Sequence, residues 1–125
     1  MIIIGYDLVS YQKHYLIHSI KDIKQTPPNA VVHLEEFDGV LMQYLFQNSL
    51  SYSVAVKNKT QLLLANALGA SFIISSDAKK DQEIATNYLF DAKVLTFINN
   101  IDEIENLVDT NIDGVIFKDA IITSY

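Results

Sequence analysis

The chain contains no cysteine, no tryptophan and no arginine, and it has only four glycines among its 125 residues. Without cysteine there can be no disulfide, no thiolate metal site and no cysteine nucleophile. The same absence suits a reducing compartment, and the first residues do not resemble a signal peptide, so we expect a cytoplasmic protein. Without arginine the chain lacks the planar group that holds phosphate or carboxylate through two parallel hydrogen bonds.

Other classes of partner are excluded by charge and spacing. The net charge of −6 disfavours nucleic acid and anionic lipid, both of which require a positive surface. No apolar stretch approaches the roughly 18–20 residues that cross a bilayer. The four glycines, at positions 5, 39, 69 and 114, are spaced too far apart for a dinucleotide fingerprint or a phosphate-binding loop. We therefore expect no nucleic-acid and no membrane partner.

Half of the residues are hydrophobic, and many of them gather in short β-branched runs that alternate with amphipathic segments of helical period. Each apolar run ends at a polar residue. The runs are Ala30–Leu34, Ser53–Val56, Ser71–Ile74, Lys93–Ile98 and Gly114–Phe117, and the expected helices are Gly39–Gln47, Lys59–Leu68, Ala78–Phe90 and Ile101–Thr110.

This alternation predicts an α/β fold with a mostly parallel sheet. We expect one domain over residues 1–125, built as a three-layer sandwich with a doubly wound sheet; the alternative is a half (βα)8-barrel-like arrangement. Residues 1–29 form an irregular N-terminal part with a strand and a short helix, residues 30–119 form the repeated βα units, and residues 120–125 form a tail. The tail is expected to be an added edge strand or a dimer contact.

Local signals place several boundaries. Leu8–His18 is ambiguous between strand and helix, and we favour a strand near Lys13–Ile17. Ser19 is expected to cap a short helix with Asp22 three residues later. The N-caps expected for the later helices are Asp38, Asn58, Asp77 or Ser76, and Asn100, and Gly69 stands where a left-handed residue ends a helix.

The carboxyl ends of parallel strands share one edge of a sheet, where ligands bind in such folds. The polar residues that follow the runs therefore form the candidate ligand site. A helix N-terminus with nearby hydroxyls and a lysine suits a small anionic group. The candidate residues are Lys57, Ser75, Ser76, Asp77 and Asn99.

A second, weaker candidate is a magnesium site formed by Asp7, Glu35 and Asp38, since carboxylate oxygens are the ligands that Mg²⁺ prefers. The competing interpretation is that Asp38 caps a helix and that acidic residues near a first helical turn favour the helix dipole whatever the function. We expect no other cofactor. His33 lies within an apolar run and is expected to be a core or edge residue with satisfied hydrogen bonds, not a ligand.

No catalytic motif is present, which favours a non-catalytic module that binds a small polar or anionic molecule or a protein partner and forms a homo-oligomer. The alternatives are a small Mg²⁺-dependent or phosphate-handling enzyme and a structural subunit of an oligomer. The sequence does not identify the ligand.

Overall fold

The computed structural model describes all 125 residues and contains one eight-stranded sheet. Most strands are three or four residues long and coincide with the β-branched runs, because such residues pack well on a pleated surface. The strands are β1 (Ile2–Ile4), β2 (His14–Leu16), β3 (Val31–Leu34), β4 (Tyr52–Ala55), β5 (Phe72–Ser75), β6 (Lys93–Ile98), β7 (Gly114–Phe117) and β8 (Ile121–Ile122).

Helices connect the strands from β2 to β8. Four are α-helical and two are 3₁₀ helices. They are α1 (Ile20–Ile23), α2 (Gly39–Gln47), α3 (Lys59–Ala67), α4 (Ala78–Asn87), η1 (Ile101–Thr110) and η2 (Lys118–Ala120). None of them has the length and hydrophobicity needed to span a bilayer.

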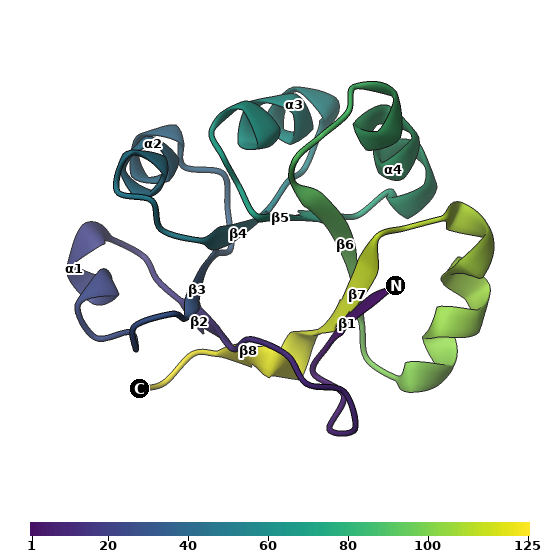
Figure 1. Ribbon diagram of the computed structural model, residues 1–125, viewed down its shortest axis with the longest axis horizontal. Helices are drawn as coiled ribbons and strands as arrows, with labels where there is room; N and C mark the ends of the chain where they lie inside the picture. Colours follow the sequence, from purple (N-terminus) through teal and green to yellow (C-terminus); the bar gives the residue numbers. More distant parts are fainter.

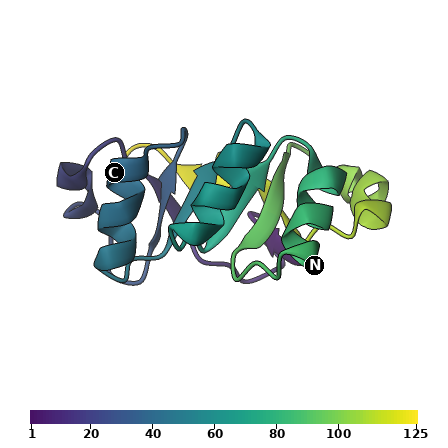
Figure 2. The same ribbon diagram turned by 90° about the horizontal axis from the view of Figure 1, so that it is seen from above.

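All neighbouring strands are parallel, in the order β1-β7-β6-β5-β4-β3-β2-β8. From β2 to β7 the spatial order is the sequence order, so each connection turns the same way and places its helix on the same face. Figure 1 shows the strands as a ring with the helices outside it, and in Figure 2 helices α2, α3 and α4 stand side by side in front of the sheet.

The α/β class with a parallel sheet is thus confirmed. Of the two expected arrangements, the curled sheet with one helical layer corresponds to the half-barrel-like form. A doubly wound sandwich requires a reversal of strand order that sends helices to both faces, and this sheet has no such reversal between β2 and β7. Without helices on the inner face, the sheet curls and packs that face against itself.

The ends of the chain bring the two sides of the ring together. After β7 the chain crosses the carboxyl end of β1 through η2 and pairs as β8 with β2. Gly5 permits this crossing: its φ is +108°, and a Cβ there would lie 2.8 Å from the Cβ of Ala120. The Tyr125 hydroxyl then donates to the carbonyl oxygen of Leu16 at 2.6 Å. Of the two roles expected for the tail, the structure shows the added edge strand.

Two apolar layers result from the alternation of side chains along each strand. The larger lies between the sheet and the helices, where Val32 and Val54 of the strands meet Met42, Leu45 and Leu62 of the helices. The second fills the ring. Its buried members are Ile4, Ile74, Leu95 and Ile116, with the partly buried Phe72, Phe97 and Ile121 packed against them.

The expected local signals are mostly found. His14–Leu16 is a strand, as favoured for that ambiguous segment, and Ser19 and Asp22 form a capping box. Asp38 and Asn58 accept from the backbone N–H groups of the residues three positions later. Gly69 has a φ of +77°. One difference is that Ile101–Thr110 winds as a 3₁₀ helix, although its expected N-cap, Asn100, forms a capping box.

Candidate functional site

The polar residues after the strands lie on the shared carboxyl edge, because every strand pair is parallel. Two of the predicted ligand residues are exposed there. Lys57 approaches Glu36 at 3.5 Å, in an ion pair whose side chains are 72% and 77% exposed. Asn99 is exposed, and its backbone N–H donates to Glu103. Such exposed pairs are worth little energy, so Lys57 remains free to move.

The other three predicted residues surround the start of α4. The Ser75 hydroxyl donates to the buried carboxylate of Asp81 and accepts from the backbone N–H of Asp77. Lys59 forms ion pairs with both Asp77 and Asp81, and these contacts raise the pKa of Lys59 above its usual value. Ser76 is exposed. Two carboxylates thus share one ammonium group beside this helix N-terminus, which makes it a poor place for an anion.

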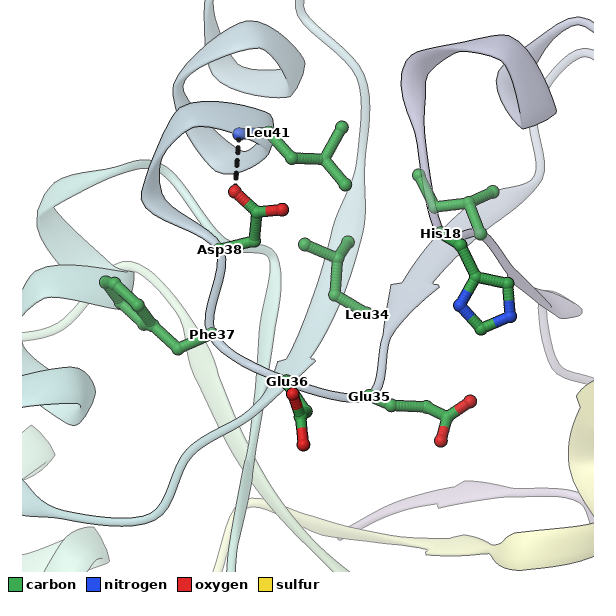
Figure 3. A pocket seen from close by; sticks show the side chains of 8 residues that line it. His18, Leu34, Glu35, Glu36, Phe37, Asp38 and Leu41 are labelled. Atoms are coloured by element: carbon green, nitrogen blue, oxygen red, sulfur yellow. Dashed lines mark hydrogen bonds between the residues drawn. The ribbon is translucent and has the colours of Figure 1, made fainter.

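Glu35, Glu36 and Asp38 border a cavity of about 390 Å³ between the ends of β2 and β3. Figure 3 shows that their carboxylates point in different directions. That of Asp38 turns to the helix and accepts from Leu41 at 3.1 Å, as the capping interpretation expects. Asp7 lies in the loop after β1. No group of three or more His, Cys, Asp or Glu side chains is close enough to hold a metal, so the structure does not bring Asp7, Glu35 and Asp38 together.

A different cavity opens at the carboxyl mouth of the ring, and we call it the mouth cavity. It measures about 320 Å³ and receives residues from both halves of the chain. Its apolar wall comes from strands β2, β4, β6 and β8. Its polar groups come from β3, from the loop after β3 and from the segment after β7. The lining residues are Leu16, His33, Glu35, Ala55, Phe97, Lys118, Ile121 and Thr123.

The polar groups of the mouth cavity carry opposite charges. Lys118 and Glu35 are both exposed, and neither forms an ion pair within the chain. The Lys118 ammonium lies 5.9 Å from the ring centroid of Phe97, close enough for a cation–π interaction. The cavity therefore combines an apolar surface with one unpaired cation and one unpaired anion, as small-molecule sites typically combine apolar walls with a few polar groups.

Beneath the mouth, the ring interior holds a buried polar cluster. The Nδ1 atoms of His14 and His33 lie 2.9 Å and 2.7 Å from the Ser53 hydroxyl oxygen. Burial lowers the pKa of each histidine to about 4, and for His33 the neighbouring His14 contributes in the same direction. Both rings are therefore neutral at pH 7. The Nε2 atom of His14 is the one buried side-chain nitrogen or oxygen without a hydrogen-bond partner.

His33 was expected to be a core or edge residue, and it is a buried one that contacts Ser53; its place in the wall of the mouth cavity was not predicted. Lys118 was recognised only as a polar residue after a strand, and Phe97 only as part of an apolar run. The sequence signal that could have placed His33 at the mouth cavity is the alternation of side chains along β3. Val31, His33 and Glu35 share one face, and that face becomes more polar toward the carboxyl end.

No protein-family model matches this sequence, and a search among curated proteins finds no significantly similar one.

Proposed function

We propose that the protein binds a small organic zwitterion, with a carboxylate, an ammonium group and an apolar body, in the mouth cavity. The observation that carries the proposal is the pairing of Lys118 and Glu35, unpaired and opposite in charge, on a cavity whose remaining wall is largely apolar. This function is a form of the expected binding module, and its site lies on the expected edge of the sheet.

The proposed contacts follow from charge. Lys118 would meet the carboxylate of the ligand, and Glu35 its ammonium group. Phe97 and Ile121 would cover the apolar body. The cavity of about 320 Å³ lies at the small end of ligand sites, which run from about 300 to 1,000 Å³. An amino acid with a branched aliphatic side chain satisfies all three requirements.

Three probes of matched shape test the proposal by thermal unfolding. L-Valine carries both charges, 3-methylbutanoate lacks the ammonium group, and 2-methylpropylamine lacks the carboxylate. A ligand that binds only the folded state stabilises it by about 2.7 kcal/mol at roughly 100 times its Kd. We expect valine to raise the melting temperature most and each single-charge probe to raise it less.

A pair of lysine variants locates the site. Lys118→Met keeps the aliphatic stem and removes the charge, so it should abolish the stabilisation by 3-methylbutanoate. Lys80→Met removes an exposed lysine of α4 and should leave the stabilisation by 3-methylbutanoate unchanged. If no probe shifts the melting temperature at about 10 mM, or if both lysine variants respond alike, the proposal is wrong.

We also infer that two copies of the chain associate. An apolar groove of about 580 Å³ lies on the outside of the ring between β1 and η1. Its wall includes Met1 and Val108, which are 55% and 59% exposed. The mass of the protein in solution should fall from dimer to monomer in Val108→Glu, and a monomeric wild type contradicts the inference.

Cytoplasmic localisation stays a prediction that cell fractionation tests.

A further inference from the structure

The buried cluster of His14, Ser53 and His33 joins three adjacent strands on the inner face of the ring. His33 and Ser53 are register partners on β3 and β4, and His14 lies on β2, whose Leu16 pairs with His33. All three residues are at most 2% exposed. Phe72 packs beside His14 and Phe97 beside His33, with ring centroids 5.3 Å and 6.4 Å apart.

Counting protons fixes how the two rings relate. Ser53 has one hydroxyl proton, and its oxygen has no hydrogen-bond partners other than the two Nδ1 atoms. An oxygen that accepted an N–H from both rings would leave the buried hydroxyl proton without an acceptor, so the arrangement that satisfies the hydroxyl is donation to one ring and acceptance of an N–H from the other. A neutral imidazole has a single N–H, so one ring is protonated at Nδ1 and the other at Nε2. His14 and His33 are held in opposite tautomers.

Two observations give the direction of the chain of hydrogen bonds. The contact of Ser53 with His33 is the shorter, 2.7 Å against 2.9 Å, and hydroxyl donors form shorter bonds than N–H donors. The unpartnered buried atom is Nε2 of His14, and an unpaired acceptor is a more common defect than an unpaired donor. In this direction the Nε2–H of His33, which lines the mouth cavity together with Lys118, has no acceptor within the chain.

We propose that a relay from His14 Nδ1–H through the Ser53 hydroxyl to His33 Nδ1 makes His33 present Nε2–H to the mouth cavity, where it selects a ligand carboxylate. The ligand part of this proposal rests on the proposed function. His33 is then a specificity-determining residue. Its Nε2–H favours a ligand group that accepts a hydrogen bond and disfavours a ligand group that donates one, such as an ammonium group. Ser53 and His14 are positioning residues that act through it.

The relay is tested in the ligand-free protein by ring-nitrogen NMR of ¹⁵N-histidine-labelled chain at pH 7.5. His33 should carry its proton on Nε2 and His14 on Nδ1, with the signals assigned through His14→Phe and His33→Phe. Ser53→Ala should return His14 to the Nε2–H form that a neutral histidine side chain prefers in water, whereas the exposed control Ser51→Ala should not. Equal tautomers in the wild type, or the reverse pair, overturn the relay.

The ligand part is tested by titration with 3-methylbutanoate. His33→Phe should weaken binding about tenfold or more, which is the loss of one hydrogen bond to a charged group. His14→Phe should bind within about threefold of wild type, because Ser53 still donates to His33. Equal losses in both variants overturn the selection by His33. If the tautomers are as described and the wild type binds no probe, the relay stands and the proposed function fails.

Discussion

Acidification should destabilise the fold through His14 and His33. The pKa of each ring is about 4 in the folded protein, against 6.5 for an unperturbed histidine. Between these two values the unfolded chain binds a proton that the folded chain does not. The contribution of the two neutral rings to the free energy of unfolding is therefore fully present above pH 6.5 and is lost as the pH drops toward 4.

The size of the effect follows from the shift. About 2.5 pKa units correspond to roughly 3 kcal/mol for each ring, and most of that loss occurs between pH 7.5 and 4.5. For a domain whose total stability is about 5–15 kcal/mol, the two rings together should make unfolding at pH 4.5 much easier than at neutral pH.

Urea unfolding at pH 7.5, 6.5, 5.5 and 4.5 measures the loss, and histidine variants isolate it from the titration of carboxylates. His14→Asn and His33→Asn remove one titrating ring while keeping a polar group near the Nδ1 position. Each should lower stability at pH 7.5 but reduce the drop toward pH 4.5 by roughly 2–3 kcal/mol. His18→Gln, which removes an exposed histidine, should keep the full drop. If all three variants and the wild type lose the same free energy, the buried rings are not the cause.

Other predictions concern stability at neutral pH. Gly69→Ala should cost more than about 1 kcal/mol, because the residue has a φ of +77° and its new Cβ would overlap the Phe46 ring; Gly39→Ala, whose Cβ meets only open space and one ring atom at 3.7 Å, should gain about 0.4–1 kcal/mol. Equal melting temperatures for the two variants would contradict this. Asp81→Ala removes the buried partner of an ammonium and a hydroxyl and should cost roughly 3 kcal/mol, whereas Glu83→Ala on the same helix should cost less than about 0.5 kcal/mol. Denaturant midpoints at pH 7.5 measure the loss of stability in Asp81→Ala and Glu83→Ala. A small loss in Asp81→Ala would show that the ion pair of Asp81 with Lys59 contributes little to the free energy of unfolding.

Much of the fold could be predicted because its signals are local. The β-branched runs, the Asp38 and Asn58 caps and the left-handed Gly69 depend on residues within a few positions of one another, and the structure confirms them. The strand near Lys13–Ile17 followed from alternation alone. Parallel pairing followed from the helix between each pair of runs.

The shape of the sheet could not be read in the same way. A run buried on both faces has the same composition whether its second face meets helices or the inside of a ring. The polar cluster depends on that difference, because His33 and Ser53 meet only when β3 and β4 are neighbours in register and their shared face lines the ring. The mouth cavity likewise needs Lys118 near Glu35, 83 positions apart by their numbering, which no local pattern indicates.

The late position of β8 has a consequence for biosynthesis. Its partner β2 is made more than a hundred residues earlier, and the hydrogen bond from Tyr125 to Leu16 spans 109 positions. While the ribosome elongates the chain, the outer edge of β2 stays without its neighbour and is open to pairing with other nascent chains. Ring closure must then wait until residues 121–125 have left the exit tunnel, after β1 to β7 have already been made.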